Sequence, residues 1–262
     1  MAAQVYFIGA GPGDPDLLTV RAVRVLREAD VVIWVDSLIP PQVVSLCRPD
    51  AQVHGSASLT REEIAALMTS AATAGKMVVR LHSGDPSLYS ALLEEMRVLE
   101  EADIEYEVVP GVSSLFAAAA ALKVELTAPG VSQTVIVTRA PGRTPMPEGE
   151  DLRALARHGA TLALFLSAAR LREAVTALLE GAYAPDTPAA IVYRASWPDQ
   201  VVLRGDLADV PRLAREAGIT RQAIVLVGRA LDPSLKGPQG PSSRLYDPAF
   251  SHLFRRRRKD DR

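Results

Sequence analysis

The sequence has a single cysteine, Cys47, among 262 residues. One cysteine cannot form a disulfide within the chain, so a hydrophobic core has to hold the fold, and the 48% of apolar residues are sufficient for one. This cysteine usage is typical of a reducing compartment, and we expect a cytoplasmic protein. No partner motif surrounds Cys47, which favours a packed side chain over a nucleophile.

Long apolar runs and an excess of positive charge are also missing. No apolar run reaches the roughly 18 residues of a membrane helix. Residues 1–5 lead directly into a strand pattern without a charged leader region, so we expect neither a membrane span nor a signal peptide. The formal net charge of -2 argues against general nucleic-acid binding. Residues 255–262 are strongly basic, and we expect a solvated terminus there.

The sequence shows no pair of residues typical of a nucleophile and its general base. His54, His82 and His158 have no recognisable catalytic spacing, and we expect most histidines to be structural. The role of His82 stays open because it adjoins a glycine-containing turn. We expect no metal site.

What the sequence does contain is an alternation of short apolar strands and amphipathic helices, which predicts a doubly wound α/β domain over residues 1–125. Thr60 and Glu63 have the spacing of a capping box, which marks the start of one helix. We expect a mostly parallel five-stranded sheet in this domain. Its predicted strands are 4–8, 31–35, 53–54, 76–81 and 105–109, and its predicted helices are 17–29, 60–74, 87–101 and 113–122.

A second α/β domain is predicted over residues 126–235. The boundary lies in residues 123–130, where periodicity weakens and Pro129 and Gly130 interrupt any regular element. Its sheet should be mixed, because Asp199 and Gln200 form too short a connection for a crossover between parallel strands. Its predicted strands are 134–138, 161–166, 189–193, 201–204 and 222–227, and its predicted helices are 150–158, 168–181 and 206–217. A tail over 236–262 follows a turn-rich linker.

Three loops containing glycine follow predicted strands of the first domain. They are residues 9–16 (Gly-Ala-Gly-Pro-Gly-Asp-Pro-Asp), residues 83–89 and residues 110–114 (Pro-Gly-Val-Ser-Ser). In the central loop, Asp85 is expected to cap a helix that has Pro86 as its first residue. Ligands bind at such carboxyl ends of strands in open α/β sheets, although any strand-to-helix turn favours glycine, aspartate and proline.

The first loop also invites comparison with dinucleotide-dependent oxidoreductases. Gly9 and Gly11 follow a strand, and Asp36 ends the next strand at the position of a ribose-binding acid. The third glycine of that fingerprint is replaced by Asp14, and Pro12 and Pro15 remove backbone donors that a pyrophosphate would need. The oxidoreductase interpretation therefore remains a remote alternative.

The three loops, in this order, resemble the tetrapyrrole methyltransferase family, and the resemblance extends over roughly residues 4–233. Three further stretches, residues 138–144, 193–199 and 228–233, are similar to members that act on precorrin-4. The resemblance implies two α/β domains with the active site in the cleft between them, S-adenosyl-L-methionine as cofactor, and a homodimer. It implies methyl transfer to C11 of precorrin-4 in cobalamin biosynthesis, giving precorrin-5. Cobalt-precorrin-4 and uroporphyrinogen III are the alternative substrates, and a non-catalytic tetrapyrrole carrier or regulator is the alternative to an enzyme.

The resemblance also implies which residues contact the cofactor. They come from the three loops and from predicted strand ends in the second domain: Pro12, Ser83, Gly84, Asp85, Leu88, Tyr89, Ser113, Ser114, Phe165, Leu166, Tyr193, Arg194, Ala195, Ala223 and Ile224. Ser83 and Ser113 stand where many members of the family have glycine or threonine, which leaves the assignment in place.

A substrate that carries many carboxylates needs arginines, which bind carboxylates in a bidentate manner. Arg139 and Arg143 flank a predicted turn at the start of the second domain and are the first candidates, followed by Arg21 and Arg80. The sulfonium of the cofactor is already activated, so positioning can supply most of the catalysis. The catalytic base stays unknown, and Asp14 and Asp36 are weak candidates.

Overall fold

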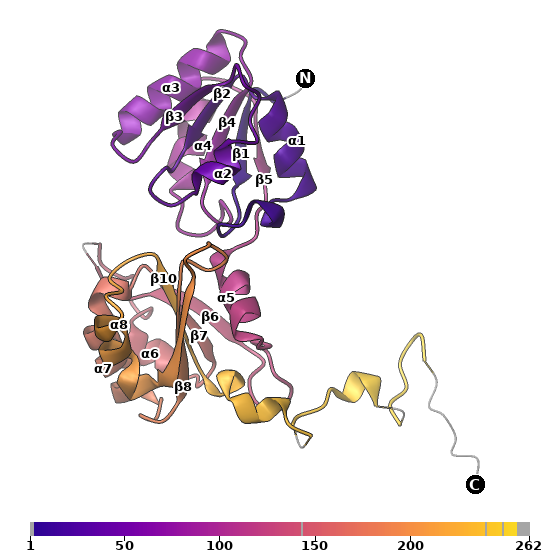
Figure 1. The fold of residues 1–262 in the computed structure, drawn as a ribbon, viewed down its shortest axis with the longest axis vertical. Helices are drawn as coiled ribbons and strands as arrows, with labels where there is room; N and C mark the ends of the chain where they lie inside the picture. The colour runs from indigo at the N-terminus through magenta and orange to yellow at the C-terminus, as the bar shows by residue number, and fades with distance from the viewer. Residues whose placement is uncertain (1–2, 143, 239, 248, 256–262) are drawn as a thin grey trace. The chain divides into compact units, whose positions relative to one another are not determined.

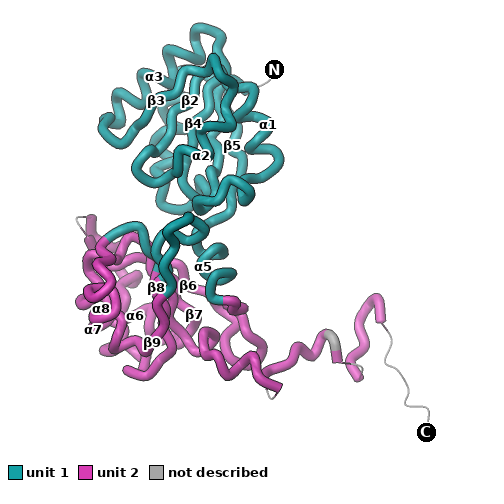
Figure 2. The backbone as a smooth tube through the Cα atoms, in the orientation of Figure 1, with its two compact units in different colours: residues 1–122, 192–202, 221–224 teal, residues 123–191, 203–220, 225–262 magenta. Residues whose placement is uncertain are grey.

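The computed structural model describes residues 3–142, 144–238, 240–247 and 249–255 (Figure 1). The chain forms two compact units (Figure 2): unit 1 holds residues 1–122, 192–202 and 221–224, and unit 2 holds residues 123–191, 203–220 and 225–262. Each unit has a five-stranded sheet, one all-parallel and one mixed, which confirms the predicted α/β fold class.

The sheet of unit 1 has the strand order β3-β2-β4-β1-β5, and every pair of neighbours is parallel. From β1 the chain passes to β2 on one side, whereas from β4 it passes to β5 on the other. β1 and β4 therefore flank the topological switch point, where open α/β sheets bind ligands. The strands are β1 Val5–Gly9, β2 Val31–Trp34, β3 Gln52–Gly55, β4 Val78–His82 and β5 Tyr106–Val109.

Helices cover both faces of this sheet. Leu26 of α1 and Val43 of α2 pack on one face with Val79, and Met68 of α3 and Leu99 of α4 pack on the other. Cys47 packs at the margin of the first cluster, and burial raises the pKa of its thiol to about 11, as expected for a packed side chain. The helices on these two faces are α1 Val20–Glu28, α2 Pro41–Val44, α3 Arg61–Thr73 and α4 Leu92–Glu101, and α5 Ser114–Leu122 follows the loop after β5.

The capping box of α3 is present, with reciprocal bonds between Thr60 and Glu63. In unit 1, two predicted helix starts are wrong, those at residues 17 and 87. The first helix begins at Val20 and not at 17, because the Thr19 hydroxyl accepts from the Ala22 N–H and residues 15–17 form a separate 3₁₀ turn. The short helix α2 was not predicted.

The larger error lies after β4, where Asp85 and Pro86 do not begin a helix. Helix α4 begins at Leu92, and Tyr89 and Ala91 have left-handed backbone angles (φ 55° and 58°) that no helix can include. Residues 83–91 therefore form one extended loop, and Asp85 bonds within it instead of capping a helix.

The sheet of unit 2 has the order β6-β7-β10-β8-β9, with β6 and β7 parallel and β7 and β10 antiparallel. The mixed character was predicted from the short connection at Asp199 and Gln200, and β8 and β9 are indeed neighbours. The elements are β6 Val135–Arg139, α6 Leu152–Ala156, β7 Thr161–Phe165, α7 Leu171–Gly181, β8 Pro188–Tyr193, β9 Val201–Asp206, α8 Val210–Glu216 and β10 Ala223–Val227.

The turn between β8 and β9 and the first residues of β10 belong to unit 1. After β10 the chain continues through 3₁₀ turns at Pro233–Lys236 and Arg244–Tyr246. The basic residues from 256 onward lie outside the described part of the chain. No helix within the described residues is both long and apolar enough to cross a membrane.

Candidate active site

The loops that follow β1, β4 and β5 meet at the carboxyl ends of these adjacent strands. The Gly11 N–H donates to the Gly84 carbonyl (3.2 Å), and the Gly84 N–H donates back to the Gly11 carbonyl (2.8 Å). The Gly111 N–H donates to the Asp85 carboxylate (2.8 Å). We call this arrangement the three-loop junction, and it brings together all three motifs that the sequence singled out.

Glycine is needed in the junction for two different reasons. At Gly111 there is no space for a side chain, because a Cβ atom would lie 2.7 Å from the Gly9 Cα and nearer still to the Gly84 oxygen. At Gly84 a Cβ would have ordinary contacts, the nearest at 3.6 Å, but the backbone has a φ of +68° that only glycine adopts without strain. The junction is thus built from backbone in close approach.

Asp85 connects the central loop to the loop after β5. Its carboxylate accepts from the Ser87 N–H (2.9 Å) and the Ser87 hydroxyl, in addition to the Gly111 N–H. Partial burial by itself would raise the pKa of Asp85, but these hydrogen bonds lower it by more, so the pKa lies below its usual value. Asp85 is therefore an ionised structural acceptor in the junction.

A buried charged cluster lies at the base of the central loop. Arg80 and His82 of β4 both face Glu95 of α4: the Arg80 Nε lies 3.0 Å from one carboxylate oxygen, and the His82 Nε2 lies 3.1 Å from the other. All three side chains are less than a tenth exposed. Burial would raise the pKa of Glu95, but its contact with His82 and the charge of Arg80 hold it below its usual value.

This cluster changes the reading of two predicted residues. Arg80 was a candidate for substrate binding, but its guanidinium is bonded to Glu95 and to the Ser56 hydroxyl (3.0 Å) in the interior. We therefore remove Arg80 from the substrate-binding set. The structure also assigns a structural role to His82. Its ring is buried between Glu95 and Phe7, and the centroids of the His82 and Phe7 rings are 5.9 Å apart.

The turn at 193–200 contributes a second group of predicted cofactor residues to unit 1. Within it, Arg194 donates to the Gln222 side chain (2.9 Å) and the Asp199 carboxylate (2.6 Å). Tyr193 and Ala195 flank Arg194, and Ala223 and Ile224 follow Gln222. Three residues that we had assigned to the cofactor, Tyr89, Arg194 and Leu166, have left-handed backbone angles without being glycine, a form of strain that gathers at functional sites.

In unit 2, the predicted residues follow β6 and β7. Leu166 directly after β7 is 71% exposed. Arg139, at the end of β6, donates to the carbonyls of Ala140 (3.3 Å), Thr144 (3.2 Å) and Pro145 (2.9 Å), so its guanidinium organises the following loop. Arg143 lies outside the described residues.

The remaining candidates have local partners. Asp14 caps the 3₁₀ turn that follows it by accepting from the Asp16 N–H (2.9 Å), and Asp36 accepts from the Ala57 N–H (2.7 Å). Both carboxylates therefore bind backbone donors, and neither is singled out as a base. Arg21 forms an exposed ion pair with Glu107.

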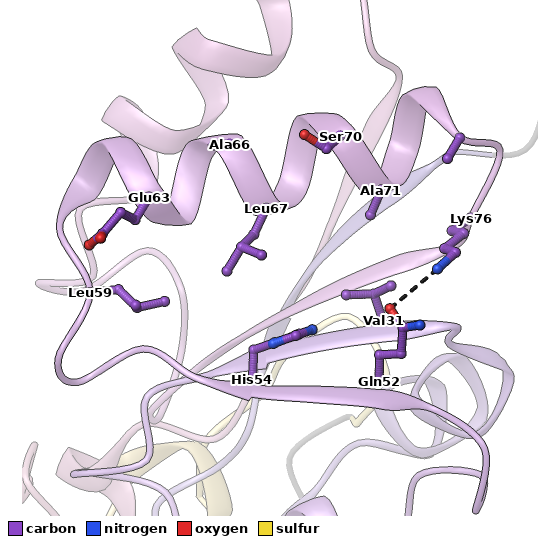
Figure 3. A pocket seen from close by; sticks show the side chains of 11 residues that line it. Val31, Gln52, His54, Leu59, Glu63, Ala66, Leu67, Ser70, Ala71 and Lys76 are labelled. Atoms are coloured by element: carbon purple, nitrogen blue, oxygen red, sulfur yellow. Dashed lines mark hydrogen bonds between the residues drawn. The ribbon is translucent and has the colours of Figure 1, made fainter.

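A cavity of about 620 Å³ lies between α3 and the edge strand β3, away from these loops (Figure 3). Leu67 and Ala71 of α3 line it, and Lys76 donates to Gln52 (3.2 Å) at its margin. None of the predicted site residues lines this cavity. Its place beside an edge strand, and not at the switch point, gives it no part in the site.

Sequence reasoning did not single out Glu95, Gln222 or three residues that bind the backbone of the loops. Trp197 donates to the Pro12 carbonyl (3.0 Å), Ser196 accepts from the Asp14 N–H (3.0 Å), and Ser167 accepts from the Ala140 N–H (2.7 Å). Trp197 and Ser196 lie in a stretch that carried the resemblance, so a search of that stretch for aromatic and hydroxyl side chains would have found them. Glu95 carried no such signal, because acidic residues are common on exposed helix faces and only the packing of α4 reveals its burial.

Comparison with known proteins gives a consistent result. A cobalt-precorrin-4 C(11)-methyltransferase of Methanocaldococcus jannaschii is 46% identical over 256 residues, covering 98% of this chain and 97% of that protein. A precorrin-4 C(11)-methyltransferase of Mycobacterium tuberculosis is 52% identical over 228 residues, covering 87% and 91%.

Solved structures agree with these relatives. The crystal structure of a cobalt-precorrin-4 methyltransferase of cobalamin biosynthesis has a TM-score of 0.85 and 46% identity, covering 87% of this chain and 96% of that one. A uroporphyrin-III C-methyltransferase of Thermus thermophilus, complexed with S-adenosyl homocysteine, has a TM-score of 0.72 and 32% identity, covering 87% and 99%. The sequence pattern of the family Tetrapyrrole (Corrin/Porphyrin) Methylases matches residues 4–211, and the chain belongs to that family.

Proposed function

We propose that this protein transfers a methyl group from S-adenosyl-L-methionine to C11 of precorrin-4, giving precorrin-5 in cobalamin biosynthesis. The observation that carries the proposal is the 52% identity to a precorrin-4 C(11)-methyltransferase over 228 residues. Its structural support is the three-loop junction at the switch point of a parallel sheet, where this fold class binds its ligands.

The junction suits a cofactor without phosphate. The N–H groups of Gly11 and Gly84 donate to each other's carbonyls, so neither glycine has a free backbone donor for a pyrophosphate. It offers instead the Ser113 and Ser114 hydroxyls, the partly exposed ring of Tyr89, and backbone groups. We propose as cofactor contacts Pro12, Ser83, Gly84, Asp85, Leu88, Tyr89, Ser113, Ser114, Phe165, Leu166, Tyr193, Arg194, Ala195, Ala223 and Ile224.

S-adenosyl-L-methionine supplies, when bound, an electrophilic methyl group on a sulfonium. The residues of the junction have to hold that group in line with the ring carbon, and such positioning can lower a barrier by ~7–11 kcal/mol. On transfer, the bond from the methyl carbon to sulfur would break as the bond to C11 forms. The sulfonium would become a neutral thioether, and the methylated ring would lose its added positive charge by releasing a proton. We propose that Arg139 and Arg143 bind the acetate and propionate groups of the substrate.

The experiment is a reaction of purified protein with S-adenosyl-L-methionine and each of three acceptors: precorrin-4, cobalt-precorrin-4 and uroporphyrinogen III. Mass spectrometry detects the added methyl, and NMR of a product made with a labelled methyl locates it. Methylation of precorrin-4 at C11 is the expected result. Exclusive turnover of cobalt-precorrin-4 would move the assignment to the metal-containing substrate, which the relative from Methanocaldococcus jannaschii favours.

We also propose that the protein is a cytoplasmic homodimer. The single cysteine supports the compartment, and family analogy supports the dimer. Sedimentation equilibrium at micromolar concentration should give twice the mass of 28.1 kDa for one chain, and a purely monomeric species would contradict the dimer.

A further inference from the structure

We infer that Trp197 is a positioning residue: it fixes the first glycine loop, residues 10–14, against the turn at 193–200, and the affinity for the methyl donor depends on this contact. The inference rests on the proposed function, since it concerns the same cofactor residues. It assigns a role to a side chain that does not belong to the proposed cofactor contacts.

The first step in the argument is a direct bond between the two segments. The indole Nε1–H of Trp197 donates to the Pro12 carbonyl at 3.0 Å, across 185 positions of sequence. Proline has no N–H to donate, so the carbonyl is the only backbone group of Pro12 that can form a hydrogen bond, and Trp197 binds it. Trp197 thus fixes a residue proposed to contact the cofactor.

The second step is the absence of a side chain at Gly13. A Cβ atom there would lie 2.5 Å from the Trp197 Nε1 and closer still to Cδ1. The indole therefore occupies the space that any other residue would fill. The glycine at position 13 is explained by this packing, and neither a phosphate nor a cofactor is required to explain it.

A neighbouring bond runs in parallel. The Asp14 N–H donates to the Ser196 hydroxyl at 3.0 Å, and the Ser196 N–H donates to the Gln200 side chain at 2.7 Å. Ser196 has a φ of 68°, so the turn holds a strained residue at the point where it meets the loop. Strain of this kind persists only where surrounding contacts determine the geometry.

Within the turn at 193–200, the indole of Trp197 also has a partner of its own. The Arg194 guanidinium lies over the Trp197 ring, 4.7 Å from its centroid, and over the Tyr193 ring at 5.4 Å. Gln222, which accepts from Arg194, donates to the Ser37 carbonyl at 2.7 Å after β2. The turn is thereby fixed to two loops at the carboxyl edge of the sheet in unit 1.

Affinity should follow from this geometry because the proposed cofactor contacts lie on both sides of it. Pro12 is on the first loop, and Tyr193, Arg194 and Ala195 are on the turn. A ligand that touches both segments binds more tightly when they are already fixed relative to each other, because less ordering remains to be done on binding. A tryptophan that only supports the fold would not change that affinity.

The test uses S-adenosyl homocysteine as the probe, titrated by calorimetry into the full chain. Trp197→Phe keeps a ring and removes the donor, and it should weaken binding about fivefold, the equivalent of one hydrogen bond. Trp34→Phe, the same change at the other of the two tryptophans, is the matched control and should leave binding within about twofold.

A double-mutant cycle adds a result that a structural role cannot imitate. Gly13→Ala and Trp197→Ala should each weaken binding by at least about tenfold. The combined variant should bind no more weakly than Trp197→Ala alone, because removing the indole makes space for the new methyl group. Circular dichroism and urea unfolding show which variants remain folded. If the alanine variants do not fold, the titration of Trp197→Phe tests the inference by itself.

The outcomes separate the two hypotheses. Equal affinity of wild type and all Trp197 variants, with only the unfolding free energy reduced, would overturn the positioning role and leave the proposed function in place. Additive losses in the double variant would likewise overturn the contact with Gly13 as the cause. Failure of the wild type to bind S-adenosyl homocysteine would remove the proposed function itself, and this inference with it.

Discussion

The ends of β1, β4 and β5 in unit 1 and the ends of β6 and β7 in unit 2 hold their loops by different means. In unit 1, Gly11 and Gly84 exchange backbone hydrogen bonds and Gly111 packs against Gly9. In unit 2, a side chain holds the loops together: the Ser167 hydroxyl accepts from the Ala140 N–H (2.7 Å) and donates to the Phe165 carbonyl (2.7 Å).

The difference predicts how each region responds to mutation. Where backbone segments of the junction approach most closely, at Gly9 and Gly111, there is no space for even one added carbon atom. The same region should lose little when a neighbouring side chain is shortened. A region held by side chains shows the opposite pattern, since each removal leaves a backbone group without its partner. The four variants below test this contrast, from the largest expected effect to the smallest.

The largest effect is expected below the junction, at Glu95. Glu95→Gln leaves the Arg80 charge buried at 5% exposure with no carboxylate, and it should lower the unfolding free energy by about 3–5 kcal/mol. Urea unfolding measures the change, and Glu94→Gln on the exposed face of the same helix is the control. A loss of less than about 1 kcal/mol would show that the buried cluster is not needed to hold the base of the loop.

The same variant predicts a change in pH dependence. The pKa of Glu95 is lower in the folded state than its ordinary value of 4.5, so its ionisation stabilises the protein above that pH. This stabilisation is lost as the pH falls through the folded-state pKa. The wild-type unfolding free energy should therefore decline below about pH 4.5 more steeply than that of Glu95→Gln; parallel curves would contradict the assignment.

Gly111→Ala should have the next largest effect and lower the unfolding free energy by about 3 kcal/mol. The new methyl group would clash with backbone atoms, which cannot change rotamer to make space. The matched control is Gly142→Ala in unit 2, where nothing lies within 4 Å of a new Cβ. That variant should change the unfolding free energy by no more than about 0.5 kcal/mol. Equal effects at the two glycines would remove the contrast between the regions.

Ser167→Ala tests the other side of the comparison. Ser167 is fully buried, and its loss leaves the buried Ala140 N–H without this acceptor, at a cost of about 1–2 kcal/mol. Ser242→Ala, at an exposed position, is the control. An unchanged urea midpoint for Ser167→Ala would mean that the loops after β6 and β7 do not depend on this hydroxyl.

Arg139→Ala should have the smallest effect on stability, below about 1 kcal/mol, because two of its three bonds are made to exposed carbonyls, those of Thr144 and Pro145. Its effect on the acceptor should be larger: loss of a charge-assisted pair weakens acceptor binding by about 1.5–3 kcal/mol and leaves cofactor binding intact. The acceptor and the cofactor are titrated separately into Arg139→Ala, and Arg157→Ala, at an exposed position, is the control. Equal losses for both ligands would withdraw Arg139 from the acceptor site.

The strands and the convergence of the three loops could be predicted from the sequence because both follow from short-range patterns. Alternating apolar segments specify a parallel sheet, and a parallel sheet places the loops after its strands at one edge. The start of α4 could not be predicted, because Tyr89 and Ala91 adopt a left-handed conformation that neither residue favours by itself.

Long-range contacts account for the other errors. Arg80 looked free to bind a substrate because its partner Glu95 lies 15 positions away on a helix whose buried face only packing reveals. The contacts of Trp197 with Pro12 and of Ser196 with Asp14 join segments more than 180 positions apart. No local pattern carries such information, and these contacts explain why position 13 is glycine.

The central claim is that the three-loop junction holds the methyl donor. Calorimetric titration of S-adenosyl homocysteine into Gly84→Val tests it most directly, because the junction needs a φ of +68° at this position while a Cβ has no closer contact than 3.6 Å. With folding verified by circular dichroism, the account predicts that binding is lost in Gly84→Val and retained in Gly142→Val. Wild-type affinity in a folded Gly84→Val protein would place the cofactor elsewhere and contradict the account.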